Sequence, residues 1–157
     1  MSDEETQLLI RRIKEGTVID HIKAGEALQV LDILGITGKD GEIVSVAMNV
    51  SSSKIGTKDV VKVANRFLRP DETDKLALVA PLATVNIIRN YKVAEKRKVE
   101  LPDLFRGILK CPNPTCISNR KNEPIIPTID VVDKEVPILK CRFCQRVISP
   151  SDTLLIA

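Results

Sequence analysis

The sequence predicts an α+β protein of two domains, in which a larger domain of strands and helices precedes a small β domain. Over the first hundred residues, short β-branched segments alternate with stretches of helical periodicity. Near Leu101 and Pro102 the composition changes, and all four cysteines lie beyond this point in a proline-rich tail. We therefore expect domains at residues 1–101 and 102–157.

The first predicted strand spans residues 17–22, which are β-branched and lie between two glycines. A helix is expected next and should end before Gly35, because apolar residues recur there with helical spacing. The predicted buried stripe of this helix consists of Ala24, Ala27, Leu28 and Leu31. Residues 43–50 alternate in polarity and predict a half-buried strand. Its apolar face should carry Val44, Val46, Met48 and Val50.

Residues 60–68 fit both a helix and a strand. Their valine content, together with a turn at 51–56, favours a strand that pairs back as a hairpin. Pro70 and the acidic residues after it predict the start of a second helix, which runs to about Ala80.

Residues 84–91 and 93–99 read as two closing strands. The resulting order is strand, helix, strand, strand, helix, strand, with one extra strand, which is the ferredoxin-like order. A sheet of this kind carries both helices on one face, so its other face is free for a ligand or a partner.

The tail should form a small β domain with strands at 125–132 and 136–140, and its cysteines have the spacing of a metal site. Four residues separate the first pair and two residues separate the second pair. Two such loops can deliver four thiolates to one tetrahedral zinc ion. The predicted zinc ligands are Cys111, Cys116, Cys141 and Cys144.

Two disulfides, an iron centre and unligated core cysteines are the alternatives to zinc. Asp3, Glu4 and Glu5 stand where a secretory leader would be basic, which disfavours persistent disulfides. A domain of about 55 residues has a marginal hydrophobic core, and a metal commonly supplies the missing stability. Four cysteines would close the coordination sphere, which disfavours a catalytic metal.

Composition and charge narrow the functional classes further. The longest apolar run is far shorter than the roughly 18 residues that a membrane span needs, so we expect a soluble cytoplasmic protein. The net charge is only +3, and aromatic residues make up 3% of the chain. Both observations disfavour the main rival, a zinc-ribbon nucleic-acid-binding protein.

Basic residues flank the cysteines, and two interpretations of them remain open. They either offset the negative charge of a zinc–thiolate centre or form a charged rim that faces a partner. These residues are Lys110, Lys140, Arg142 and Arg146.

Five sequence strings, in both predicted domains, resemble one known family. They are GTVIDHI at 16–22, APLATVN at 80–86, NYKV at 90–93, CPNPTCI at 111–117 and KCRFC at 140–144. Together they are similar to the regulatory chain of aspartate carbamoyltransferase. The resemblance covers nearly the whole chain with the motifs in the same order.

The resemblance implies that the chain is not itself an enzyme but the regulatory subunit of one in pyrimidine biosynthesis. Its first domain would bind CTP, ATP and also UTP as allosteric effectors, and its zinc domain would dock on the catalytic chain. Regulatory chains would form homodimers that join catalytic trimers. The sequence agrees with this division, since it has one histidine and no phosphate-binding glycine-rich loop.

The resemblance also implies an effector site. Carried over by motif, it comprises Ile10, Arg12, Ile13, Asp20, His21, Lys62, Asn86, Ile88, Tyr91, Val93 and Lys96. Lys96 and His21 suit the phosphates, while Asp20 can accept hydrogen bonds from ribose hydroxyls. Lys62 can donate to the ribose or the base. Backbone groups near positions 10, 12, 13 and 88 would read the base and so admit both purines and pyrimidines.

Two questions about this implied site can be answered only beyond the sequence. Asp20 and His21 would point to opposite faces of a regular strand, so both can reach one ligand only if the strand is irregular there. Arg11 and Arg12 stand where an acidic or small residue is expected. They predict a changed affinity for triphosphates or a changed ranking of CTP, ATP and UTP.

Overall fold

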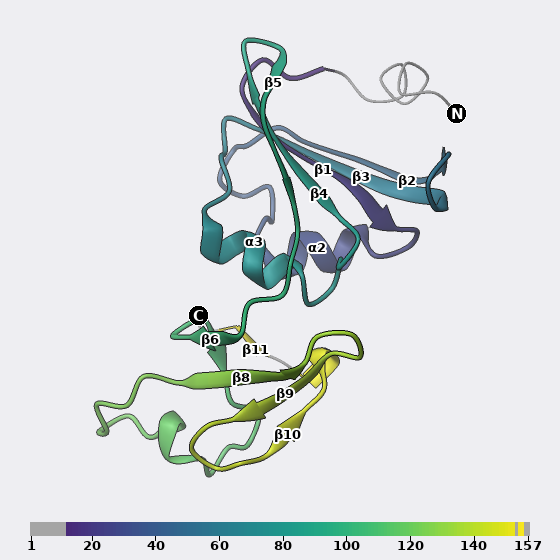
Figure 1. The fold of residues 1–157 in the computed structure, drawn as a ribbon. Helices are drawn as coiled ribbons and strands as arrows, with labels where there is room; N and C mark the ends of the chain where they lie inside the picture. Colours follow the sequence, from purple (N-terminus) through teal and green to yellow (C-terminus); the bar gives the residue numbers. More distant parts are fainter. Residues whose placement is uncertain (1–11, 153, 156–157) are drawn as a thin grey trace. The chain divides into compact units, whose positions relative to one another are not determined.

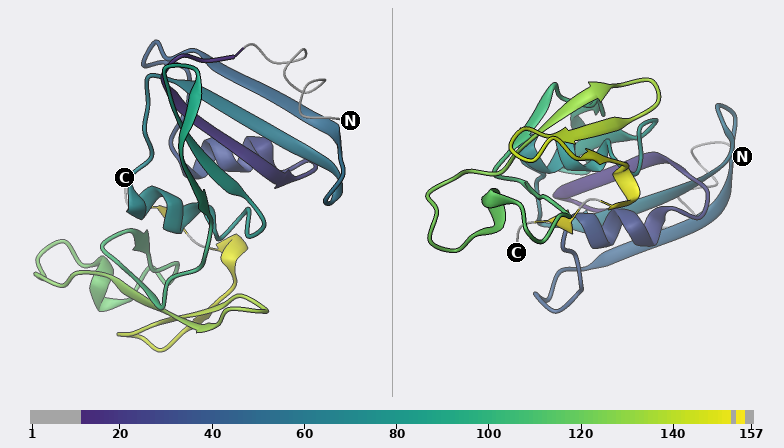
Figure 2. Two further views of the ribbon diagram at one scale, coloured as in Figure 1. Left: turned by 45° about the horizontal axis from the view of Figure 1, so that its top comes forward. Right: turned by 90° about the horizontal axis from the view of Figure 1, so that it is seen from below.

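The computed structural model describes residues 12–152 and 154–155 and divides into two compact units, Met1–Glu100 and Leu101–Ala157. The first unit contains a five-stranded antiparallel sheet in the order β2-β3-β1-β4-β5. Figures 1 and 2 show two helices packed on one face of this sheet. The elements are β1 (Gly16–Lys23), α2 (Ala27–Ile33), β2 (Val44–Ser52), β3 (Gly56–Ala64), α3 (Pro70–Leu76), β4 (Thr84–Arg89) and β5 (Lys92–Lys98). The α+β class and the ferredoxin-like order are thus confirmed.

The strand register separates the two faces of the sheet. Ile19 of β1 lies opposite Val61 of β3 and Val85 of β4, and all three are fully buried. This row faces the helices, where Val30 and Leu76 complete the core. The intervening rows of the same strands face the other side of the sheet, because successive side chains alternate.

A glycine opens β1 because no other residue fits there. Gly16 has a φ of +143°, and a Cβ atom at this position would lie 2.2 Å from the carbonyl oxygen of Val63. The close pairing of β1 with β3 therefore depends on the missing side chain.

The first helix forms where periodicity predicts it, but the predicted buried stripe is right only at Ala27. Ala27, Val30 and Ile33 are buried, whereas 63% of Leu28 is exposed and Leu31 is only partly buried. Two overlapping apolar stripes occur in this segment, and packing against the sheet selects the one that contains Val30.

The predicted apolar face of β2 is also wrong, because a β-bulge interrupts the strand between Ala47 and Val50. Asn49 takes a φ of +60° at the bulge. Val44 and Val46 share the face of Val63 and Val61, whereas Val50 packs on the opposite face beside Val60. An extra residue in one strand reverses the alternation beyond it.

The other elements follow the predictions with shifted ends. The ambiguous segment is a strand, β3, which pairs with β2 as a hairpin but ends at Ala64 rather than Leu68. The helix that begins at Pro70 ends at Leu76, earlier than predicted, and turns continue to Val79.

The second unit is a small β structure. A four-stranded sheet has the order β10-β9-β8-β6, and β11 pairs with β7. Over its described residues, the large buried apolar side chains are Phe105, Leu109, Ile129, Leu139 and Ile148, and three of the cysteines are buried with them. The strands are β6 (Leu104–Arg106), β7 (Leu109–Lys110), β8 (Thr128–Asp133), β9 (Ile138–Cys141), β10 (Val147–Ile148) and β11 (Leu154–Leu155), with 3₁₀ turns at Ile117–Asn119 and Pro150–Asp152. The predicted strands at 125–132 and 136–140 correspond to β8 and β9.

Within the part of the chain that the structure describes, no helix is both long enough and apolar enough to cross a lipid bilayer.

Candidate functional site

The helix-free face of the first unit holds a cavity of about 670 Å³. Its floor is a row of paired positions that crosses four strands: Lys62 of β3 and Asn86 of β4 both lie opposite Val18 of β1, and Lys96 of β5 lies opposite Asn86. Side chains that are directly opposite one another on a sheet share a face. The sheet therefore brings together residues from positions 18 to 96.

Ten of the eleven residues proposed from the resemblance line this cavity. They are Arg12, Ile13, Asp20, His21, Lys62, Asn86, Ile88, Tyr91, Val93 and Lys96. Ile10 and Arg11 lie outside the described residues. The structure thus gathers the ten into one place, while their role in binding stays a prediction.

A β-bulge explains how Asp20 and His21 can line the same cavity. The pairing of β1 with β3 shifts register between Ile19 and Ile22, and His21 takes a φ of +58°. Its backbone N–H donates to Oδ1 of Asp20 over 2.7 Å. Ile19 and Ile22 both remain buried on the helix side, so the bulge turns the two polar residues outward together.

Sequence reasoning missed seven residues that also line the cavity: Val18, Ser52, Ser53, Lys54, Lys58, Val60 and Lys92. Lys58 is the most consequential, because its buried ammonium group lies 3.0 Å from Oδ1 and 3.2 Å from Oδ2 of Asp20. Alternation along β3 was a usable signal for two of the seven. Lys58 and Val60 precede Lys62 by four and two positions, and even steps along a strand lead to the same face.

The cavity is strongly cationic. Among the described residues that line it, Asp20 is the one carboxylate, and Lys58 already neutralises its charge. The cationic side chains are Arg12, Lys54, Lys58, Lys62, Lys92 and Lys96. A concave surface with this excess of positive charge attracts anions and concentrates them near the sheet.

The charges also shift the ionisation of groups in the cavity. Burial lowers the pKa of His21, and the positive charges of Lys58, Lys54 and Lys96 lower it further, against the opposing effect of Asp20. Burial, followed by the charge of Arg12, lowers the pKa of Lys62. His21 is therefore neutral near pH 7 until an anion binds beside it.

Asn86 contributes a polar group that lacks a partner. Its Oδ1 atom is buried and accepts no hydrogen bond from any described residue. Because a buried carbonyl oxygen without a donor is costly, this atom is suited to accept a hydrogen bond from a ligand.

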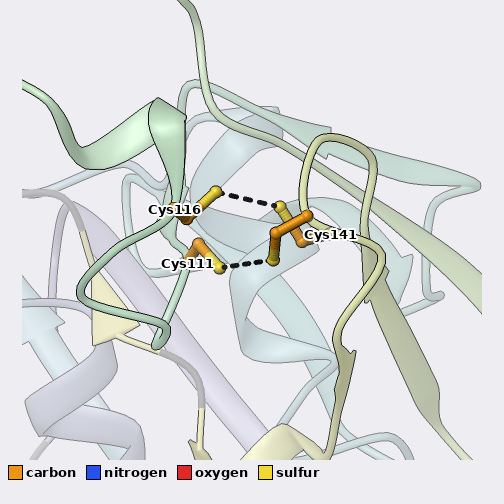
Figure 3. A group of neighbouring side chains, drawn as sticks. Cys111, Cys116 and Cys141 are labelled. Atoms are coloured by element: carbon orange, nitrogen blue, oxygen red, sulfur yellow. Dashed lines mark hydrogen bonds between the residues drawn. The ribbon is translucent and has the colours of Figure 1, made fainter.

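The four cysteines of the second unit form a cluster that could hold a metal ion. Their sulfur atoms all lie within 4.8 Å of one another. Figure 3 shows the side chains of Cys111, Cys116 and Cys141 turned toward a common point. The Sγ atoms of Cys111 and Cys144 are 3.7 Å apart, as are those of Cys116 and Cys141.

These distances fit a tetrahedral metal and exclude disulfides in this arrangement. Four sulfurs at about 2.3 Å from one zinc ion would be about 3.8 Å apart, whereas bonded sulfurs are separated by about 2.0 Å. The four thiols are free, and three of them are buried. The donor set therefore fits a closed, thiolate-bound cation.

Two of the four thiols resist ionisation without a metal. Burial raises the pKa of Cys111 to about 12 and also raises that of Cys141. Burial opposes ionisation of Cys144 too, but donors that include the backbone of Arg146 outweigh it and lower the pKa to about 7. A divalent cation must displace protons to bind here, so its affinity falls on acidification.

Hydrogen bonds hold the loop of the first cysteine pair. The side-chain amide of Asn119 donates to the carbonyl oxygens of Cys111 and Asn113 over 2.9 and 2.7 Å. The hydroxyl of Ser118 lies 3.1 Å from Sγ of Cys116. Groups of this kind orient metal ligands and tune their charge.

Fold and sites together define a class of two-domain α+β protein, with a cationic cavity on the sheet of one domain and a four-cysteine cluster able to hold a metal in the other. Comparison with known families agrees for both units. Residues 8–100 match the model described as aspartate carbamoyltransferase regulatory chain, allosteric domain, and residues 103–153 match the metal binding domain of the same chain. The protein belongs to the family of aspartate carbamoyltransferase regulatory chains.

Curated relatives support the same assignment over most of the chain. The aspartate carbamoyltransferase regulatory chain of Cenarchaeum symbiosum is 55% identical over 94% of this chain and 95% of its own length. The corresponding chain of Thermofilum pendens is 53% identical over 94% of this chain and 93% of its own. That of Methanothrix thermoacetophila is 56% identical over 90% and 92%.

Proposed function

We propose that this chain is a non-catalytic subunit that binds nucleoside triphosphates and thereby controls the catalytic chain of an aspartate carbamoyltransferase in pyrimidine biosynthesis. The observation that carries the proposal is the cationic cavity, which lies in the unit that matches the allosteric domain. CTP and ATP are the proposed effectors, together with UTP. Each carries a polyphosphate that the excess of lysines can bind.

The sheet register suggests how a triphosphate lies in the cavity. Asp20 pairs with Thr84 at one end of β4, and Gly16 pairs with Ile88 near the other, a separation of about 13 Å for four residues of strand. His21, Lys54 and Lys58 gather at the first end and Lys96 lies between, so the phosphates belong there. In this pose the ribose lies at the border of the phosphate end, where Asp20 accepts from it, and Lys62 donates to the ribose or base.

The base belongs at the second end, where apolar surface is concentrated. Ile13, Ile88, Tyr91 and Val93 line the cavity, and Ile88 lies opposite Val93 where β4 turns into β5. Backbone groups near positions 12, 13 and 88 would contact the edge of the base. The resemblance adds the backbone near Ile10 to this group.

We further propose that residues 1–101 act as the effector domain and residues 102–157 as a zinc domain that docks on the catalytic chain. Cys111, Cys116, Cys141 and Cys144 would hold one structural Zn²⁺, whose tetrahedral preference the sulfur geometry fits. When bound, the ion supplies folding energy rather than chemistry. A homodimer of regulatory chains is proposed as the assembly unit, since β2 is an edge strand among the described elements and exposes Val46 and Met48.

The decisive experiment purifies this chain with its catalytic partner and measures carbamoyl transfer against substrate concentration. CTP and ATP should each displace the saturation curve, because an effector that prefers one state of the assembly shifts it toward that state. A coupling of about 1–3 kcal/mol corresponds to a roughly 5- to 150-fold change in affinity. A curve that neither nucleotide moves would show that the proposal is wrong.

Lys96→Ala should weaken every triphosphate by roughly 3- to 10-fold, since it removes one charge-assisted contact to phosphate. The loss should shrink at high ionic strength, because salt screens an exposed charge. Calorimetric titration with CTP and ATP at two salt concentrations measures both effects. Lys39→Ala is the control: it removes one exposed lysine of the same unit that neither lines the cavity nor lies on a strand of the sheet. Equal losses in the two variants would contradict a direct phosphate contact.

Nucleotide binding should take up a proton at His21. Its pKa is lowered from 6.5 in the free protein, chiefly by burial, and a polyphosphate placed beside it raises that pKa. Affinity should therefore increase as pH falls through the pKa of the complex, and level off below the lowered pKa of the free protein. Titrations in buffers of different ionisation enthalpy report the proton uptake directly.

The variant His21→Gln separates this effect from protonation of the nucleotide itself. It should lose the part of the pH dependence that belongs to the protein and keep the part that belongs to the phosphate. Proton uptake that is the same in both proteins would contradict the assignment of His21.

A further inference from the structure

Arg12 stands at the base end of the cavity and brings a cationic side chain to it. Its guanidinium Nη2 donates a hydrogen bond of 3.0 Å to the backbone carbonyl of Tyr91. Both residues line the cavity together with Ile13. The hydrogen bond fixes the guanidinium at the rim of the apolar surface proposed for the base.

The hydrogen-bond partner of Arg12 lies away from the phosphate end. Tyr91 lies between β4 and β5, three residues beyond Ile88, and Ile88 pairs with Gly16 at the second end. The charge of Arg12 also lowers the pKa of Lys62, after burial, and Lys62 pairs with Val18, two strand positions from Asp20 toward Gly16. Arg12 is therefore placed to meet the base or the sugar rather than the polyphosphate.

A guanidinium group offers only hydrogen-bond donors, five in a planar fork. One N–H is committed to the Tyr91 carbonyl, and others remain for a ligand. Such a fork matches a carbonyl oxygen next to a ring nitrogen, which is the edge that an oxo-purine presents. Adenine presents an amino group at the same place, so donor would meet donor.

We propose that Arg12 is a base-selecting residue that makes the cavity prefer a base with a carbonyl oxygen, so that ITP binds more tightly than ATP. The inference rests on the proposed function, since it requires that the cavity binds nucleoside triphosphates. ITP and ATP differ in the 6-oxo and 6-amino groups and in the proton on N1, and they carry the same triphosphate. The expected preference is about fivefold, which is below the range for a hydrogen bond to a charged group because Arg12 is exposed to solvent.

Calorimetric titration of the zinc-loaded full chain with ITP and ATP tests the inference. In Arg12→Met the preference for ITP should disappear. The variant should lose more affinity for ITP than it loses for ATP. Arg12→Lys should keep most of the overall affinity but lose much of the preference, because a point charge lacks the fork. The ratio of the two affinities should not change with salt, since both ligands carry the same charge.

Lys14→Met is the matched control, because it removes one exposed positive charge from the same segment outside the cavity. The Lys14→Met variant should change the affinities for ITP and ATP only slightly and by the same factor. Equal losses for both nucleotides in Arg12→Met, or no preference in the unmodified chain, would overturn the inference while leaving the proposed function intact. Absence of binding by any nucleotide would overturn the proposed function itself.

Discussion

Removal of the metal will unfold the second unit and abolish its docking on the catalytic chain, while the first unit keeps most of its nucleotide affinity. Over its described residues, the second unit has only five large buried apolar side chains besides its cysteines, which is a small core for its length. Ligation of a structural zinc ion by thiolates contributes about 10–16 kcal/mol in small zinc-dependent folds. Loss of that contribution is as large as the whole stability of an ordinary domain, about 5–15 kcal/mol.

The measurement uses the assembled complex. A mercurial reagent displaces the metal, a chromogenic chelator counts the ions released, and sedimentation reports whether the two kinds of chain separate. Cys111→Ser should behave like the metal-free protein, because one ligand is lost from a closed site. Ser118→Ala is the control, since Ser118 contacts Sγ of Cys116 without being a ligand. A complex that stays intact without metal would show that the cysteines do not support docking.

Asp59→Ala will destabilise the first unit by about 3–5 kcal/mol, because three backbone N–H groups lose a buried, charged acceptor. Asp59 is fully buried, and its carboxylate accepts three backbone hydrogen bonds. Oδ2 accepts from Gly25 and Ala27 over 2.9 and 3.0 Å, and Oδ1 accepts from Asn49 over 2.9 Å. Removal of the carboxylate leaves these N–H groups without their acceptor.

Asp59→Asn should cost less, about 1–3 kcal/mol, because the amide keeps one oxygen but turns an NH₂ group toward backbone donors. Urea unfolding of the zinc-loaded chain measures both losses. Tyr91, the one tyrosine in a chain without tryptophan, gives a fluorescence signal from the first unit alone. Asp40→Ala is the control for an exposed aspartate and should change stability by less than about 0.5 kcal/mol. A similar small change in Asp59→Ala would contradict the role given to its carboxylate.

Asp59 also shows why some of the fold could not be predicted. Helix α2 begins at Ala27, and Glu26 before it supplies no side-chain cap. The missing acceptor comes from Asp59 on β3, 32 residues along the chain. Local capping rules find acceptors within a few residues, so they cannot find this one.

Much of the second unit's site could be predicted, because metal ligation demands short spacings. The pairs Cys111–Cys116 and Cys141–Cys144 each sit on one loop, and a single ion needs both. The spacing alone does not say whether the two loops meet, and the sulfur separations of 3.7 Å show that they do.

The sequence by itself determined the element order, the cysteine site and, through its family strings, most of the residues that line the cavity. Each of these depends on neighbours in the chain or on residue identity. Only the tertiary structure decided that Asp20 and His21 share a face, that Lys58 neutralises Asp20, and which stripe of α2 is buried. Bulges, ion pairs and packing faces are set by the strands and helices that an element meets, and those contacts join residues far apart in sequence.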